Sequence, residues 1–325
     1  MKTLQRIDVQ ILRELLKDGR KSFRDIAKEC NTVDDVIRAR YKELKKADVI
    51  VGATIQFNFQ KLGYSGVAST NLSVESQDFE NTLDRLGKIS NIRSVTPLYN
   101  SPFNISAIFT LKELSDLECM KQVLCRQNRI TSIRTFIWTD VRNIPENIFG
   151  NSAENEGYKA FLESTLLRTQ KETPNIDESD MRIIDLLSVN GRLPFSNIAR
   201  QIGSSTATVS RKYERLKNNN LIKVSIQINP AKVGFQCILA INLSLANPDE
   251  TNEVTNRLSE ITGVSYILKI SGSYDLSLSA LVKDCNDIIE INKQILKIPN
   301  IKGIEANLRP LPKSWPTPRQ YISTL

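Results

Sequence analysis

The chain has 325 residues, a formal net charge of +8, five cysteines and no histidine. This length exceeds what one typical hydrophobic core organises, so we expect several domains. No apolar run approaches the ~20 residues that a membrane-spanning helix needs, which argues against an integral membrane protein. Without histidine the chain lacks the commonest general base and most transition-metal ligand sets. We therefore expect a protein that is not an enzyme and that holds neither a cofactor nor a metal.

The cysteines form no CxxC pair, and the segment after Met1 lacks the apolar core of a signal peptide. Both observations indicate the cytoplasm. The positive charge is concentrated in two stretches: residues 1–50 carry 13 Lys/Arg against 9 Asp/Glu, and residues 176–226 carry 8 against 5. Such an excess is typical of a polyanion-binding surface and also of an ordinary solvated one.

Residues 1–57 are predicted to begin with three short helices. Apolar residues recur at helical spacing in each of them: Ile7, Ile11, Leu12 and Leu15, then Phe23, Ile26 and Ala27, then Ile37, Tyr41 and Leu44. We expect Gly19 to end the first helix as a C-cap. Ser22 and Asp25 have capping-box spacing at the start of the second. A short second helix and a tight turn before the third helix indicate a helix-turn-helix.

Residues 58–138 change to a period of two. Strands are predicted over 67–74, 92–99, 105–111 and 130–138, with helices over 79–87 and 114–126. This βαββαβ order is that of the split-βαβ, ferredoxin-like sandwich. Its sheet would expose one apolar face unless something covers it, so we expect pairing with a second such sheet.

Residues 139–175 are predicted to be a linker, with Pro145 and Pro174 as helix breakers. Within the linker, Tyr158, Phe161, Leu162, Thr165 and Leu166 have helical spacing. The sequence leaves open whether this stretch docks or only tethers the two halves.

Residues 176–309 repeat the first half. Residues 180–222 align without a gap to 8–50 at an offset of 172, and 12 of 43 positions are identical, against about two or three expected by chance. We expect Gly191 to cap a helix as Gly19 does, Gly203 to force the tight turn and Ser205 to cap the third helix. Strands are predicted over 237–245, 264–271, 276–282 and 301–308, with helices over 252–261 and 286–296.

The outward face of each third helix bears on the function. The second copy carries hydroxyls and cations suited to phosphates and base edges in a major groove, namely Ser204, Ser205, Thr206, Thr208, Arg211, Lys212 and Arg215. The first copy has Asp34 and Asp35 there, which suit the helix dipole but repel phosphates. Arg38 and Arg40 remain as its candidates. We expect double-stranded DNA as the partner, bound mainly by the second copy.

The chain resembles the Lrp/AsnC family of prokaryotic transcription factors. The resemblance lies in residues 176–192, 198–211, 216–222 and 229–235, and more sparsely in Asp8, Gly19-Arg20, Ile26-Ala27 and 61–64. It implies an α+β fold of two tandem repeats, each a winged helix-turn-helix followed by a βαββαβ, ferredoxin-like domain of the RAM type. The predicted domains are 1–57, 58–138, 139–175, 176–228 and 229–309, with a Pro-rich extended tail at 310–325.

The resemblance also implies a sequence-specific DNA-binding regulator on the nucleoid, modulated by an amino acid or related effector. The duplication suggests an intramolecular pseudo-dimer, and it leaves further assembly into homo-oligomers open. Family members often bind effectors near a Gly-x-x-Asp loop, which in the second copy supplies Ser271, Gly272, Tyr274 and Asp275. The first copy has Pro102 and Phe103 instead and is degenerate. A turn glycine and a capping aspartate are the alternative interpretation.

Two other functions stay open. The fused siroheme decarboxylases also consist of two similar units, but the resemblance to them implies active-site histidines, which this chain lacks. The other alternative is an interaction scaffold whose helix-turn-helix no longer binds DNA.

Overall fold

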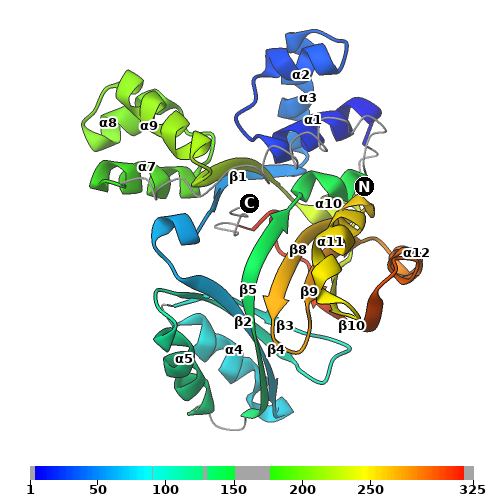
Figure 1. The fold of residues 1–325 in the computed structure, drawn as a ribbon. Coiled ribbons are helices and arrows are strands. Elements are labelled where there is room, and N and C mark those ends of the chain that lie inside the picture. The colour runs from blue at the N-terminus through cyan, green and yellow to red at the C-terminus, as the bar shows by residue number, and fades with distance from the viewer. Residues whose placement is uncertain (1–3, 90, 127–129, 151–175, 318–325) are drawn as a thin grey trace. The chain divides into compact units, whose positions relative to one another are not determined.

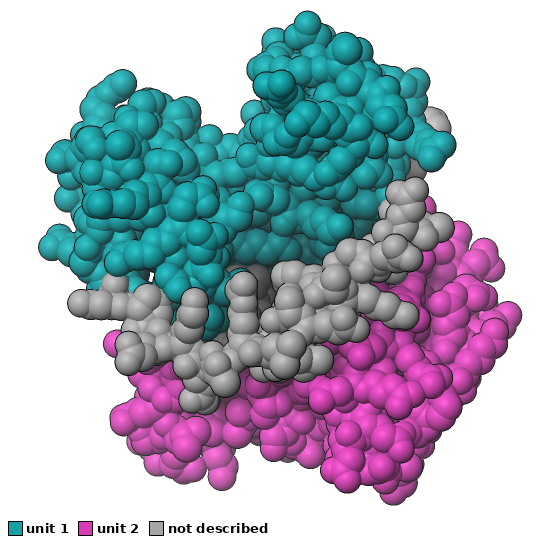
Figure 2. Space-filling model, turned by 45° about the horizontal axis from the view of Figure 1, so that its top comes forward, with its two compact units in different colours: residues 1–62, 143–235, 312–325 teal, residues 63–142, 236–311 magenta. Residues whose placement is uncertain are grey.

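The computed structural model describes residues 4–89, 91–126, 130–150 and 176–317. The chain divides into two compact units, which Figure 2 colours separately. Unit 1 comprises residues 1–62, 143–235 and 312–325, and unit 2 comprises residues 63–142 and 236–311. Each unit therefore combines matching segments from both copies. Among the described residues, no helix is long and apolar enough to cross a membrane.

Unit 1 contains both helix-turn-helix motifs (Figure 1). The first consists of α1 (Arg6–Lys17), α2 (Phe23–Glu29), α3 (Asp34–Lys46), β1 (Ile50–Phe57) and the 3-10 turn η1 (Gln60–Leu62). The second consists of α7 (Glu178–Val189), α8 (Phe195–Ile202), α9 (Thr206–Asn218), β6 (Ile222–Ile228) and α10 (Pro230–Val233). The apolar faces that the periodicity predicted are buried, including Ile11, Leu15, Ile37, Leu44, Ile183, Leu187, Val209 and Leu216.

The two wing strands form one antiparallel ribbon, in which Thr54 of β1 lies opposite Ser225 of β6. Both hydroxyls reach the first helix of the other copy. Thr54 Oγ1 donates to the carbonyl of Ser188 at 3.1 Å, and Ser225 Oγ donates to the carbonyl of Leu16 at 3.0 Å. Each wing is thereby tied to both helix-turn-helix motifs.

The prediction that Gly19 and Gly191 are helix C-caps is wrong. Neither glycine has a positive φ. The helices α1 and α7 end instead at Asp18 and Asn190, which have extended backbone. Neither glycine therefore acts as a left-handed helix cap.

The two glycines permit a close approach between the copies. The N–H of Gly19 donates to the carbonyl of Val224 at 2.9 Å, and the N–H of Gly191 donates to that of Ala53 at 2.8 Å. A Cβ on Gly191 would lie 2.9 Å from the carbonyl oxygen of Thr54, and one on Gly19 would meet the β6 backbone at 2.8 Å. Any side chain would force the wing strand and the helix end apart.

Ser22 and Ser205 are N-caps, although the structure records no reciprocal capping box between Ser22 and Asp25. The Ser22 hydroxyl accepts from the N–H of Asp25 at 3.1 Å, and that of Ser205 accepts from the N–H of Thr208 at 3.0 Å. Gly203 ends α8 in the left-handed conformation, with φ of 69°. These caps satisfy donors that each helix start leaves without an intrahelical partner.

The start of the predicted linker is ordered. Strand β5 (Ile130–Asn143) is followed by the 3-10 turn η3 (Pro145–Phe149), in which Ile148 is buried. The Arg13 guanidinium on α1 donates to the carbonyls of Phe149 at 3.1 Å and Gly150 at 2.7 Å. The helical stretch predicted from Tyr158 to Leu166 lies outside the described residues.

The Pro-rich tail was predicted to lack regular structure and to form an extended arm; residues 312–317 form no helix or strand, but they are held against the protein. Trp315 is buried and exchanges two backbone hydrogen bonds of 2.8 Å with Ile228 of β6. Gln227 Nε2 donates to Ser314 Oγ at 3.0 Å. The start of the tail is therefore docked on the wing of the second copy.

Unit 2 contains both βαββαβ segments, and the predicted fold class is confirmed. The first consists of β2 (Gly66–Val74), η2 (Ser76–Asp78), α4 (Phe79–Gly87), β3 (Ile92–Pro97), β4 (Ile105–Leu111), α5 (Ser115–Cys125) and β5. The second consists of β7 (Cys237–Leu245), η4 (Pro248–Glu250), α11 (Thr251–Glu260), β8 (Val264–Ser271), β9 (Leu276–Val282), α12 (Cys285–Leu296) and β10 (Ile301–Pro310). The predicted boundaries hold within two residues except in β5, which continues to Asn143.

The expected pairing of the two sheets takes place within unit 2. The strands form one eight-stranded sheet in the order β10-β7-β9-β8-β5-β2-β4-β3, so β8 of one copy pairs with β5 of the other. The outer strands of the two halves are β3 and β10. Tyr99, which follows β3, and Leu308 of β10 exchange two backbone hydrogen bonds of 2.9 Å. Each four-stranded half therefore makes backbone hydrogen bonds to the other copy at both of its edges.

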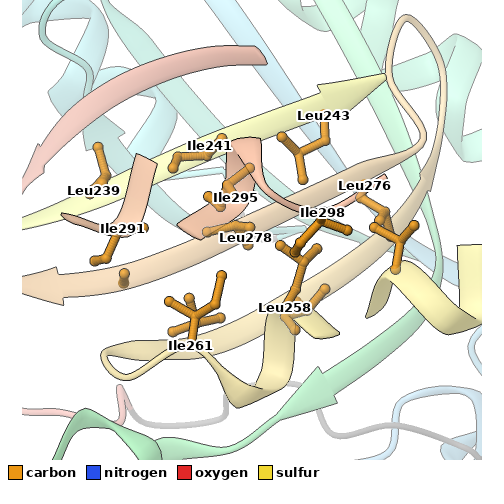
Figure 3. Packing of buried hydrophobic residues seen from close by; sticks show 14 of the residues in the cluster. Leu239, Ile241, Leu243, Leu258, Ile261, Leu276, Leu278, Ile291, Ile295 and Ile298 are labelled. Atoms are coloured by element: carbon orange, nitrogen blue, oxygen red, sulfur yellow. The ribbon is translucent and has the colours of Figure 1, made fainter. Parts of the chain in front are cut away.

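Each half-sheet has a separate apolar core against its own helices. In the second copy, Leu239, Ile241 and Leu243 of β7 pack with Leu258 of α11 and Ile295 of α12 (Figure 3). In the first copy the equivalent cluster includes Leu72, Leu86, Ile105, Phe109 and Leu124.

The opposite face of the sheet is more polar than predicted. Strand alternation places Asn71, Ser106, Asn242 and Asn307 on the side away from the helices. All four are buried, with exposures of 1–5%. The prediction of an apolar face is wrong at these positions, and the two halves are joined by backbone pairing at their edges.

We predict that Gly191→Ala destabilises the protein by about 1–3 kcal/mol, because the added Cβ overpacks the contact between the copies. The measurement is the free energy of unfolding from urea denaturation. Gly87→Ala at the end of α4 is the control, since nothing lies within 4 Å of its Cβ position. Equal effects of the two substitutions would contradict the close-approach role.

Candidate nucleic-acid interface

Helix α9 presents a short polar surface at its N-terminal end. Ser204, Ser205 and Thr206 are exposed, and Thr208 is half-buried with its hydroxyl 2.9 Å from that of Ser205. Arg211 is exposed one turn further along. Within the described residues, the Arg211 guanidinium has neither an ion pair nor a hydrogen bond, so it is available to an external partner.

Lys212 and Arg215 are directed elsewhere, which corrects the prediction that all the cations lie on one outward face. Lys212 Nζ lies 2.5 Å from Asp177 Oδ2 and 3.1 Å from Asp180 Oδ1. The Arg215 guanidinium donates to the other oxygen of Asp180, which is fully buried. These two cations neutralise a carboxylate at the start of α7.

Protonation reflects this pairing. Burial alone lowers the pKa of Lys212, but its hydrogen bonds to Asp177 and Asp180 raise it overall. The pKa of Asp177 is held far below its ordinary value, first by the bond from Lys212 and then by those from Ser179 and the Asp180 backbone. Both groups are therefore charged at neutral pH.

The first copy keeps the buried ion pair, and its exposed cation Arg38 is paired within α3. Arg40 corresponds to Lys212 at the offset of 172, and its Nε lies 3.9 Å from Asp8 Oδ1. Arg38 is paired with Asp34 at 3.0 Å. Both candidate cations of the first copy therefore have a carboxylate partner within the chain, and their contact with DNA stays a prediction.

The aligned positions of α3 and α9 differ most on the face that would enter a DNA major groove. Ala39 stands where α9 has Arg211, and Asp34 stands where it has Thr206. Val33 is 63% exposed at the position of Ser205. The first copy thus offers apolar and acidic groups where the second offers hydroxyls and a free cation.

The loop between β8 and β9 contains the predicted effector residues. Ser271 and Gly272 are exposed, whereas Tyr274 and Asp275 are half-buried. Asp275 Oδ2 accepts from the N–H of Leu245 at 2.7 Å, which fastens the loop to the end of β7. One carboxylate oxygen therefore has a structural role.

The first copy uses an asparagine for the same purpose. Asn104 Oδ1 accepts from the N–H of Val74 at 2.9 Å, and its amide donates to the Val74 carbonyl at 2.6 Å. Gly272 also has an internal reason, because a Cβ there would lie 2.9 Å from Cδ1 of Phe136. The Phe136 ring therefore takes the place beside the Gly272 backbone that a glycine would leave open for an effector.

Sequence reasoning missed a charged cluster on the polar face of the sheet. Arg134 Nη1 of β5 lies 2.9 Å from Glu305 Oε2 of β10, and the Tyr274 hydroxyl donates to the same carboxylate at 2.7 Å. The Arg134 guanidinium also lies 4.6 Å from the centre of the Phe103 ring. Burial and the bond to Glu305 raise the pKa of Tyr274. Arg134 and Glu305 lie on strands that are not neighbours in the sheet, so no local motif marks this cluster.

The structure is thus that of a duplicated winged-helix protein with two paired α+β domains. Residues 176–217 match the AsnC-type helix-turn-helix domain, residues 4–51 a winged helix-turn-helix DNA-binding domain, and residues 236–308 the Lrp/AsnC ligand binding domain. The chain belongs to the Lrp/AsnC family of transcriptional regulators.

Two regulators similar in sequence to this chain each match less than half of it. An uncharacterized HTH-type transcriptional regulator of Pyrococcus furiosus is 30% identical over 142 residues, which are 43% of this chain and 95% of that one. HTH-type transcriptional regulator LrpA of Pyrococcus abyssi is 30% identical over 130 residues, 40% of this chain and 90% of that one. These matches are consistent with the duplication and fusion of one unit.

A solved structure resembles the chain over nearly its whole length. The siroheme decarboxylase NirDL has a TM-score of 0.63 at 15% identity, covering 97% of this chain and 93% of that one. At this level of identity the likeness concerns the fold.

We predict that Lys212→Met makes the free energy of unfolding fall less steeply as the pH is lowered. Since the folded-state pKa of Asp177 is lowered, its stabilisation is present above about pH 5 and is lost as the pH falls. Removing Lys212 removes the first cause of that shift. The measurement is urea denaturation between pH 3 and 7. Arg38→Met, which breaks an exposed pair, should leave the slope unchanged; an unchanged slope in Lys212→Met would refute the assignment.

Proposed function

We propose that the chain binds duplex DNA sequence-specifically and that the second winged helix makes the base contacts. The observation that carries this proposal is the unpaired, exposed Arg211 on a helix whose first turn holds hydroxyls and no acidic residue. Arginine pairs bidentately with guanine, and hydroxyls and N-terminal backbone N–H groups contact phosphates. The protein would act on the nucleoid in the cytoplasm and catalyse no reaction.

The pairing of both copies within each unit supports a single chain as the DNA-binding pseudo-dimer. Its two third helices would then meet two different half-sites, because Arg211 of α9 has Ala39 as its counterpart in α3. The operator would be asymmetric, with one half contributing most of the discrimination between sequences.

We predict that Arg211→Ala weakens specific DNA binding by about 5- to 150-fold, since one base-reading contact is worth about 1–3 kcal/mol. The measurement is a fluorescence-anisotropy titration at fixed salt with a duplex selected from a random pool by the wild-type chain. Arg38→Ala in the first copy is the matched control and should change the affinity less than about threefold. Equal losses would overturn the ranking of the copies.

An amino-acid-like effector would bind the loop at Ser271, Gly272, Tyr274 and Asp275 in the second copy only. Exposed Ser271 and Gly272 leave the loop accessible. The Asp275 carboxylate gives one oxygen to Leu245, and the other supports a charge-assisted hydrogen bond from an ammonium group. Asn104 in the first copy is neutral, which supports the absence of an equivalent ammonium site there.

We predict that Asp275→Asn abolishes effector binding without unfolding the domain, because Asn104 shows that an amide fastens this loop equally well. Asp275→Ala should lose both the ligand and part of the stability, by about 1–3 kcal/mol for the unsatisfied N–H of Leu245. Calorimetry across the amino acids and thermal unfolding measure the two effects. Binding that survives Asp275→Asn would place the effector site elsewhere.

The fold shared with NirDL favours one alternative, a tetrapyrrole enzyme. The absence of histidine from the sequence counts against it, because imidazole is a common haem-iron ligand and general acid–base. Titration with iron-uroporphyrin III, followed in the Soret band, distinguishes the two. A saturable spectral shift would favour the enzyme.

A further inference from the structure

Two arginines at equivalent positions cross between the two helix-turn-helix motifs. Arg20 and Arg192 each follow the glycine that makes the close backbone contact. The Arg20 guanidinium donates to the carbonyl of Leu193, and Arg192 Nη1 donates to the carbonyl of Gly19 at 2.5 Å. The contacts are reciprocal: the guanidinium of each copy donates to a backbone carbonyl of the other copy.

Each guanidinium also lies over a pair of aromatic rings in the other copy. Arg20 Cζ is 4.3 Å from the ring centre of Phe195 and 5.2 Å from that of Tyr213. Arg192 Cζ is 5.2 Å from Phe23 and 5.4 Å from Tyr41. These distances are within the range of cation–π contacts.

The rings connect the guanidinium to the helix that would enter the groove. Phe195 begins α8 and Tyr213 lies in the middle of α9, with ring centres 5.1 Å apart. Phe23 and Tyr41 occupy the same places in α2 and α3 at 5.0 Å. Each third helix is therefore held by an arginine from the opposite copy.

The environment favours arginine over lysine. Burial lowers the pKa of Arg20, and the neighbouring Arg192 lowers it further, while Asp18 raises it. A guanidinium stays charged under these conditions, donates from a planar fork and stacks on ring faces, whereas a lysine ammonium does not stack in this way.

The contacts of the wing ribbon described above are made to the ends of α1 and α7. A two-stranded antiparallel sheet by itself is only marginally stable. The arginines add contacts to α3 and α9, away from the ribbon. They are thus placed to set the separation and angle of these two helices.

We propose that Arg20 and Arg192 are positioning residues that fix the distance between the two DNA-reading helices, so that one chain accepts a single half-site spacing. This inference rests on the proposed DNA-binding function and adds its spacing specificity. Half-sites read by paired helix-turn-helix motifs are spaced by whole turns of about 10 base pairs. A rigid unit would therefore reject an insertion of half a turn.

The test compares wild type with the double variant Arg20→Lys/Arg192→Lys. The probes are the duplex selected by wild type from a random pool, the same duplex with 5 base pairs inserted between its footprinted halves, and a single half-site. We expect the insertion to weaken wild-type binding at least tenfold and the double variant less than threefold. Half-site affinity should be the same for both proteins.

Arg24→Lys/Arg200→Lys is the control, because both arginines are exposed and neither makes an ion pair within the part of the chain that the structure describes. It should keep the wild-type spacing profile. A double variant at Arg20 and Arg192 that also keeps this profile would overturn the proposal. Thermal unfolding shows whether each protein is folded.

A measurement without DNA separates this inference from the proposed function. Spin labels on genetically encoded keto amino acids at Lys42 of α3 and Glu214 of α9, both exposed, report the distance between the helices. We expect one narrow distribution in wild type and a broad one in the Arg20→Lys/Arg192→Lys protein. Narrow distributions in both proteins would refute the positioning role. Failure of wild type to bind duplex DNA would refute the function instead.

Discussion

Unit 1 depends on a backbone contact that only glycine permits. The N–H groups of Gly19 and Gly191 each donate to a carbonyl on the wing of the other copy. This approach lets β1 and β6 pair along their length. It also places Arg20 and Arg192, the next residues, within reach of the opposite rings. A bulkier residue at either glycine would disturb the hydrogen bond, the ribbon and the arginine contacts together.

Fusion lets the two copies diverge where a homodimer could not. Both retain the buried aspartate and its cation, as Asp8 with Arg40 and Asp180 with Lys212, because an unpaired buried charge is costly. The exposed positions are under no such constraint, and α9 has Arg211 where α3 has Ala39. The packing is therefore symmetric, whereas the surface is not.

Much of this organisation follows from local sequence. The α+β fold, Gly203 and the cap at Ser205 were predicted because periodicity and capping act within a few residues. The direction of Lys212 was not, because its partner Asp180 lies 32 residues away. The role of Gly19 was misread for the same reason, since the atoms that exclude a Cβ belong to β6. Contacts between copies leave no pattern in either copy alone.

The sheet of unit 2 carries a related consequence of fusion. Arg134 and Glu305 occupy equivalent places, since Arg134 lies opposite Asn71 on β2 and Glu305 lies opposite Asn242 on β7. In a homodimer the two-fold mate of an arginine is another arginine, and like charges 3 Å apart repel. Here the mates have opposite charges and form an ion pair at 2.9 Å. If two chains exchanged their second copies, Arg134 of one chain would still meet Glu305 of the other. Pairing two first copies, or two second copies, would bring like charges together. The ion pair therefore selects one first copy against one second copy, which is the arrangement that a single chain supplies to itself at high effective concentration.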